Sequence, residues 1–501
     1  MSDLVFYYDE TEHSRRINYQ TVSASNYYDN FITVIVGWDR DREEDIRKKY
    51  DDFENKYSER KNAKGELKST TLQQKKFQYG LASQDKNNIL FIRDFLSIID
   101  EDFHVYFSVS SKIEYIVFQL FSDYKNCLFI DADAMKYSIT KVLNVYRPEN
   151  VIDCLCNSPN KFVDELISFF KKCIDHNRNS GELKKQENQA FEEIISYLEN
   201  VSVIPKDEWN YRLPFEGFLK YLKEESIGTY RLILDKEGSP DTESKTLKAA
   251  KEIGIENVSE GDSSELFGLR IADMLVGIIA KLMKALRDSL CYHSFEEANK
   301  KKILDNKWFD LNEMQFETYK RLSSIICKWD HAWYKSYAGN YSDDLLSLIS
   351  LFQYIDHFEA PEQIKSNLLM QGEYFNGFVC DQLKQYFDKR RNKLPIEHLS
   401  KSDDEFFLNQ KGAKVFFDVE RQPALKIDTS IVVEVLSIGM SNAGRPLVTI
   451  LKNGQPVCCR LPVELSKWAQ TLIGFANMGE NLFPTRVRFT KTSNHYYADI
   501  L

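Results

Sequence analysis

The sequence of 501 residues predicts an α/β fold followed by a β-rich region, and three observations support this prediction. Two apolar segments, LVFYYD and YRLILD, are rich in aromatic and branched residues, and they end at Asp9 and Asp235. Long segments with apolar residues at helical spacing lie between and after them. From Glu405 onward, short apolar segments separated by Gly, Asn and Pro turns are typical of strands.

The first part of the chain is expected to contain several strands and two helices. After the opening strand, strand-like segments occur at Ile17–Ser23 and Phe31–Gly37, and a further strand is expected at Val105–Ser110. A highly charged helix is expected over Asp41–Asn62, and a short amphipathic helix is expected from Thr71.

The second part of the same domain is expected after a helical insertion. Lys112–Tyr211 has a mostly helical pattern with a polar break at His176–Asn188. The strand YRLILD then leads to a crossover helix over Asp241–Ile253, a short strand over Glu256–Ser259 and an apolar helix that carries Asp273. The predicted domain is therefore split into residues 1–112 and 213–290, with the insertion at 113–212.

Two further domains are expected after residue 290. The range 291–404 is predicted to be helical, with amphipathic segments such as Leu311–Lys335 and Gln371–Arg391. The range 405–501 is predicted to be a small β-rich domain, with strands at VFFDVE, SIVVEVLSIG, PLVTILK, QPVCCRL and TRVRFTK. About three domains is also what the chain length favours.

The two strands that end in aspartate indicate a binding site. Side chains alternate along a strand, so Asp9 shares a face with Tyr7, and Asp235 shares a face with Ile233. Ligands in open α/β sheets collect at the carboxyl ends of strands, where both aspartates stand.

A third aspartate interrupts an apolar helix. Asp273 lies against an apolar stripe, and an unpaired buried carboxylate costs several kcal/mol or becomes protonated. A metal ion or a basic partner would remove this cost, and pairing with Arg270 is the structural alternative. The stripe consists of Leu269, Ala272, Val276, Ile279 and Met283.

Glu66 and Lys68 lie in the segment GELKS, between the charged helix and the segment from Thr71. Taken alone they are typical of solvated charges at helix boundaries.

The order of these segments resembles the ribonuclease H-like superfamily, and more closely the bacterial domain of unknown function 3800 family. That family is similar in opening with a Tyr-x-Asp-Glu-Ser-Gly-like strand, carrying a Glu-x-Lys segment, and closing with a Gln-x-Ala-Asp-x-x-Ala-Gly-like helix. The corresponding stretches are Tyr7–Thr11, Glu66–Lys68 and Arg270–Gly277. The opening reads DETEHS and lacks the family's glycine, and Leu269-Arg270-Ile271 stands where the family tends to have Leu-Gln-Leu.

The resemblance covers Met1 to about Lys112 and about Leu213 to Leu286, and it implies a metal-dependent nuclease with a ribonuclease H-like mixed sheet. The implied ligands of Mg²⁺ or Mn²⁺ are Asp9, Glu66, Asp235 and Asp273, with Asp9 as the bridging ligand of two ions. Lys68 is expected either to neutralise a phosphate oxygen or to pair with Glu66.

The resemblance also implies a role as an effector in bacterial antiviral or mobile-element systems, switched on by a partner. The substrate would be nucleic acid, with DNA and RNA both open. The alternative from another class is a non-catalytic module that uses the same fold to bind nucleic acid or protein.

A rival motif occurs near the end of the helical region. Arg391 and His398 resemble the Arg-Asn…His signature of the higher-eukaryote-and-prokaryote nucleotide-binding (HEPN) ribonucleases, which cleave RNA without metal. Pro395 stands between them and is expected to break the helix that should present both residues. The plain interpretation is a basic helix end followed by a turn.

Composition limits the class of protein further. A formal net charge of −10 does not favour a protein that coats nucleic acid nonspecifically, so phosphate binding would depend on local basic clusters at 281–287, 300–302 and 384–393. The longest apolar stretch, Met274–Leu286, is too short to span a membrane. Nine cysteines without a C-x-x-C pair favour a reducing cytoplasm.

Overall fold

The computed structural model describes residues 3–11, 18–24, 27–124, 132–178, 184–198, 201, 211–236, 242–292, 297, 301–329, 331–336, 341, 343–397, 423–440, 446–452, 454–477, 482–492 and 495–501. The chain divides into two compact units. The first comprises Met1–Ser122 and Ala134–Gln382, and the second comprises Asp123–Asp133 and Leu383–Leu501.

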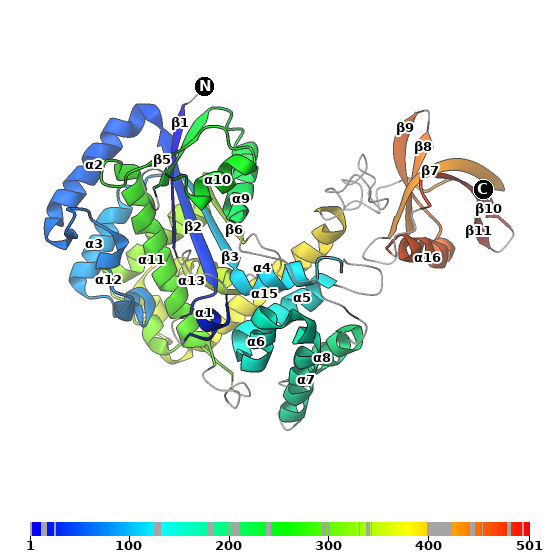
Figure 1. Ribbon diagram of the computed structural model, residues 1–501, viewed down its shortest axis with the longest axis horizontal. Coiled ribbons are helices and arrows are strands. Elements are labelled where there is room, and N and C mark those ends of the chain that lie inside the picture. The colour runs from blue at the N-terminus through cyan, green and yellow to red at the C-terminus, as the bar shows by residue number, and fades with distance from the viewer. Residues whose placement is uncertain are drawn as a thin grey trace. The chain divides into compact units, whose positions relative to one another are not determined.

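A mixed sheet forms the centre of the first unit, with the strand order β5-β4-β1-β2-β3-β6 (Figure 1). β2 is antiparallel to both β1 and β3, whereas β4 is parallel to β1, β5 to β4 and β6 to β3. The α/β class is thereby confirmed. The strands are β1 (Leu4–Thr11), β2 (Asn30–Asp39), β3 (His104–Ser111), β4 (Tyr230–Asp235), β5 (Val258–Gly261) and β6 (Ala332–Ser336).

Helices cover both faces of this sheet (Figure 1). The face of β1 that carries Tyr7 belongs to a large apolar core together with α2 (Glu43–Lys56), α3 (Lys86–Leu96) and α11 (Phe267–Leu290). The face that carries Phe6 packs on α9 (Arg212–Glu224) and α10 (Lys245–Glu252). Burial on both sides explains why β2 reads as the near-continuous apolar run NFITVIVGW.

The apolar stripe of α11 is buried as the sequence predicts, because the helix packs against β1 and β2. Its close approach depends on Gly268, where an added Cβ would lie 2.4 Å from Cδ2 of Tyr7. A larger residue there would push the helix away from the strand.

The range predicted as a helical insertion is helical in its described residues. Its described helices are α4 (Lys112–Leu120), α5 (Ala132–Tyr146), α6 (Glu149–Asn157), α7 (Pro159–Asn177) and α8 (Lys185–Leu198). The expected polar break, His176–Asn188, overlaps the end of α7 and the start of α8, and residues 179–183 within it lie outside the described part of the chain.

Two local predictions were wrong. The strand expected at Ile17–Ser23 is the short helix α1 (Tyr19–Ser23), because Asn18 and Thr21 form a reciprocal capping box that favours helix over the local β propensity. Ile17 itself lies outside the described residues. The helix expected from Thr71 is a series of 3₁₀ turns, Ser69–Thr71, Gln74–Phe77 and Gly80–Ser83. Gly80 adopts a left-handed φ of +58°, which interrupts any continuous helix.

The region after residue 290 contributes to the same core as the sheet. α12 (Glu313–Ser323) and α13 (Asp343–Asp356) carry core residues such as Phe316 and Phe352. The segment expected to be helical over Leu311–Lys335 changes from α12 to a π-helical turn at Ser324–Lys328 and then to β6. β6 is paired with β3, so its backbone hydrogen bonds are satisfied by the sheet rather than by a helix.

The second unit contains a separate antiparallel sheet with the strand order β11-β10-β7-β8-β9, as the β-rich pattern predicts. Its elements are β7 (Ser430–Met440), β8 (Pro446–Lys452), β9 (Gln455–Arg460), α16 (Ser466–Asn477), β10 (Thr485–Lys491) and β11 (Tyr496–Ile500). The predicted strand VFFDVE lies outside the described residues.

Candidate metal centre

Three of the four predicted carboxylates lie near one another where the inner strands β1 and β4 of the mixed sheet end. β1 and β4 pair in parallel with Tyr8 opposite Leu234, so the next residues, Asp9 and Asp235, stand side by side at the carboxyl ends of their strands. Asp273 on α11 interacts electrostatically with both aspartates. The parallel register and the helix therefore bring three like charges together from distant parts of the chain.

The carboxyl of Asp9 has a strongly raised pKa. Burial, and then the charges of Asp273 and Asp235, raise its pKa well above the usual value of 3.8. The backbone N–H of Glu10, 2.7 Å from Oδ1, and the charge of Lys68 counter this effect only in part. The site therefore holds more negative charge than its own cation balances.

The carboxyl of Asp235 also has a raised pKa. Burial raises its pKa, Lys68 opposes the rise, and Asp273 adds to it. The Nζ atom of Lys68 lies 3.7 Å from Oδ2 of Asp235, and the backbone N–H of Ser263 donates to the same carboxylate.

Asp273 is held by the turn that follows Lys68. The backbone N–H of Ser69 donates to Oδ2 at 2.7 Å, and the Ser69 hydroxyl donates to Oδ1 at 3.1 Å. This contact requires a glycine on α11, because a Cβ at Gly277 would lie 2.2 Å from Cβ of Ser69.

The alternative of a pair between Asp273 and Arg270 does not describe this geometry. Arg270 forms an ion pair with Glu54 at 3.2 Å and donates to the carbonyl of Ser263 at 2.6 Å. Arg270 thus anchors the loop before α11, and Ser263 on that loop faces the carboxylates.

Glu66 lies at the rim of the group and is buried. Its carboxylate accepts hydrogen bonds from Asn62 and from the Ser263 hydroxyl, both at 3.1 Å. Burial would raise the pKa of Glu66, but these two hydrogen bonds and the charge of Lys68 hold it below its usual value. Lys68 donates to Ser263 Oγ at 2.9 Å, so Ser263 links Lys68 to Glu66 while the ion pair of Lys68 is with Asp235.

The acidic group, defined as Asp9, Glu66, Asp235 and Asp273, is a loose arrangement. In the part of the chain that the structure describes, one group of three ligand side chains brings its atoms within 4.8 Å of one another, and it is a different one: His104, Glu225 and His331. The acidic side chains are held by Ser69, Asn62 and Ser263, so a cation would have to draw them closer together.

Sequence reasoning missed the serine residues that position the carboxylates. Ser69 directly follows the Glu-x-Lys segment, which is a usable signal because a hydroxyl there can reach the same site as Lys68. Ser263 carries no such signal, since serine in a polar turn before a helix is common.

The side chains of the rival motif, Arg391 and His398, lie outside the described residues. Arg391 itself lies in α15 (Gln371–Glu397). The break expected at Pro395 is wrong, because the helix continues to Glu397.

Part of the basic clusters is occupied by local partners. Lys301 pairs with Glu373, and Lys302 pairs with Glu297 at 3.0 Å. Within 281–287, Lys284 and Arg287 lie over the ring of Tyr28. The side chains from residue 387 to 393 lie outside the described part of the chain.

No described helix has the length and apolar character needed to cross a bilayer.

No protein-family model, curated protein or solved structure is significantly similar to this chain.

Gly277→Ala is expected to destabilise the first unit by about 1–3 kcal/mol, because the new methyl group would overlap Ser69. Gly377→Ala on α15 is the matched control. A Cβ there meets nothing within 4 Å, so this change should be neutral or stabilise by about 0.5–1 kcal/mol. Urea unfolding of both variants checks the difference. Equal stability of the two variants would contradict the close packing of Ser69 on α11.

Asp9→Asn is expected to stabilise the chain in EDTA at pH 7 by about 1–2 kcal/mol. The folded pKa of Asp9 is raised, so its ionisation opposes folding above that pKa, and the cost disappears as the pH falls toward 3.8. The gain of the variant should therefore shrink with acidification in urea unfolding experiments.

The control for this experiment is Asp52→Asn, an exposed position on α2, which should change stability by no more than about 0.5 kcal/mol. A destabilised Asp9→Asn protein, or a gain in stability that does not vary with pH, would contradict this account. Either result would show that neighbouring groups already offset the cost of ionising Asp9.

Proposed function

We propose that this chain is a metal-dependent nuclease of ribonuclease H-like fold that hydrolyses phosphodiester bonds in nucleic acid. The observation that carries the proposal is that Asp9, Asp235 and Asp273 lie near one another at the carboxyl ends of the parallel strands β1 and β4. Burial, and then the charges of Asp273 and Asp235, raise the pKa of Asp9, and Lys68 offsets this rise only in part. Mg²⁺ and Mn²⁺ favour such all-oxygen sites with excess negative charge.

The strand order supports the assignment of the fold. Three antiparallel strands, β1 to β3, are followed by β4 and β5, which lie in parallel on the other side of β1. This agrees with the order of segments on which the resemblance to the ribonuclease H-like superfamily and the domain of unknown function 3800 family rests. Asp9 stands on the strand that joins the two halves of the sheet.

The side chains present fit the implied cation. Asp9, Asp235 and Asp273 would hold it, and Glu66 would join from the rim after release from Asn62 or Ser263. A divalent cation held there would supply charge for a phosphoryl oxygen and acidify a bound water.

The neighbouring groups have roles of their own. Ser69 fixes the orientation of Asp273 through two hydrogen bonds, so this carboxylate is preorganised. Lys68 is partly buried beside Asp235, and its ammonium group can shift to a phosphate oxygen that enters the site. Loss of Lys68 would therefore weaken substrate binding as well as the balance of charge.

The biological setting that the resemblance implies is part of the same proposal. The chain would act in the bacterial cytoplasm as an effector of antiviral or mobile-element defence. Its net charge of −10 argues that a protein partner or a local basic surface brings nucleic acid to the site.

A cleavage assay tests the proposal. Labelled single-stranded and duplex DNA and RNA are incubated with the wild type, Asp273→Asn or Asp52→Asn in Mg²⁺ or Mn²⁺. We expect cleavage of at least one substrate by the wild type and by Asp52→Asn. The rate should fall by at least about 100-fold in Asp273→Asn, because the site loses charge that acts on the reacting phosphate.

EDTA should abolish the activity. Equal cleavage by the wild type and Asp273→Asn would remove the carboxylates from the reaction, and cleavage that survives EDTA would direct attention to Arg391 and His398.

A further inference from the structure

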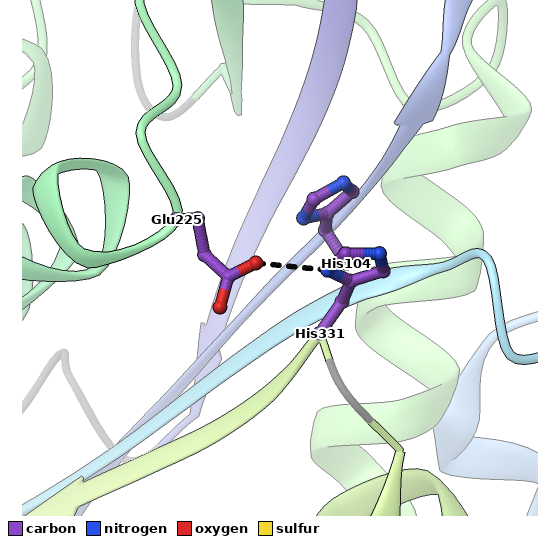
Figure 2. A group of neighbouring side chains, drawn as sticks. All are labelled: His104, Glu225 and His331. Carbon is purple, nitrogen blue, oxygen red and sulfur yellow. Dashed lines mark hydrogen bonds and ion pairs between the residues drawn. The ribbon is translucent and has the colours of Figure 1, made fainter.

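A second group of potential ligands lies on the opposite face of the sheet from the acidic group. His104 begins β3, Glu225 follows the last residue of α9, and His331 precedes β6. Figure 2 shows the Glu225 side chain directed at His331, with the two imidazole rings close to each other. The Nδ1 atom of His331 lies 2.8 Å from Oε2 of Glu225, and one ligand atom from each residue lies within 4.8 Å of the other two.

A buried tyrosine contacts one ring nitrogen of His104. The hydroxyl of Tyr221 lies 2.6 Å from Nδ1 of His104 and 3.3 Å from the carbonyl oxygen of His331. When the hydroxyl donates to this carbonyl, its oxygen accepts from Nδ1–H of His104, and the lone pair of the neutral imidazole is on Nε2.

Access and ring geometry are compatible with an incoming ion. The side chain of His331 is 39% exposed and that of Glu225 is 21% exposed, so the group opens to solvent on one side. The two rings are stacked, with centroids 4.3 Å apart and an interplanar angle of 25°. Nitrogens of nearly parallel rings do not converge on one point, so one imidazole must turn about its Cβ–Cγ bond to share an ion.

We propose that His104, Glu225 and His331 form a binding site for a divalent transition-metal ion, with Zn²⁺ as the favoured ion. Two imidazoles and one carboxylate suit Zn²⁺ and its neighbours in the first transition series, whereas Mg²⁺ favours oxygen ligands alone. Tyr221 supports the site by holding His104 through its second nitrogen, the usual arrangement for a histidine ligand.

The site joins three segments that are far apart in the sequence. The bound ion would connect the end of α9 with the strands β3 and β6, and it would stabilise the folded chain against unfolding. It is separate from the acidic group, because His104 contacts Phe6 on the α9 face, whereas Asp9 faces α11. The proposal does not depend on nuclease activity.

Zinc titration of the full-length chain tests the site. The metal-free protein is titrated with Zn²⁺ against a chromophoric chelator, and thermal unfolding is followed with and without the ion. We expect one Zn²⁺ per wild-type chain at this site and a higher unfolding temperature with Zn²⁺. Substitution of an outer partner alone costs about 10–100-fold in metal affinity, so His331→Ala and Glu225→Gln should lose at least that much.

Three further variants make the result specific. Tyr221→Phe should weaken Zn²⁺ binding by about 10-fold. His357→Ala, an exposed histidine outside the group, and Asp52→Asn, an exposed carboxylate outside both groups, should bind Zn²⁺ like the wild type. Equal affinity of the wild type, His331→Ala and Glu225→Gln would overturn the proposal. Co²⁺ gives an independent readout, because its visible bands should change in His331→Ala and not in His357→Ala.

Discussion

Three aspartates from distant parts of the chain lie near one another in the first unit, and their like charges repel one another. The parallel pairing of β1 and β4 places Asp9 beside Asp235, and α11 places Asp273 near the same strand ends. Neither burial nor proximity favours three ionised carboxylates, and Lys68 offsets only part of the cost. Such an arrangement persists when the surrounding fold over-determines it, and a bound cation would turn the repulsion into binding energy.

The supporting contacts explain how the fold holds this arrangement. Gly268 and Gly277 let α11 approach Tyr7 and Ser69 closely, so the Asp273 carboxylate has little freedom to turn away. On the other side of the group, the buried pair of Arg270 and Glu54 anchors the loop that carries Ser263. The hydrogen bonds of Ser69 and Ser263 therefore orient carboxylates that would otherwise separate.

Sequence patterns predicted the element on which each aspartate lies, but not that the aspartates come together. Alternation along the two strands placed Asp9 and Asp235 at strand ends, and the apolar stripe of α11 placed Asp273 against the core. Their grouping was implied by the family resemblance. The capping box of Asn18 and Thr21 overrode a strand-like pattern. β6 could not be predicted because it depends on pairing with β3, from which it is distant in the chain. The group of His104, Glu225 and His331 gave no motif, since tertiary packing alone brings it together.

The central claim is that the acidic group binds a divalent cation, and Mn²⁺ binding followed by electron paramagnetic resonance tests it most directly. The free-ion signal would be titrated with the wild type, Asp9→Asn and Asp52→Asn. The account predicts Mn²⁺ binding by the wild type and by Asp52→Asn, with affinity at least about 10-fold weaker in Asp9→Asn. Identical binding by all three proteins, or binding by none, would contradict it.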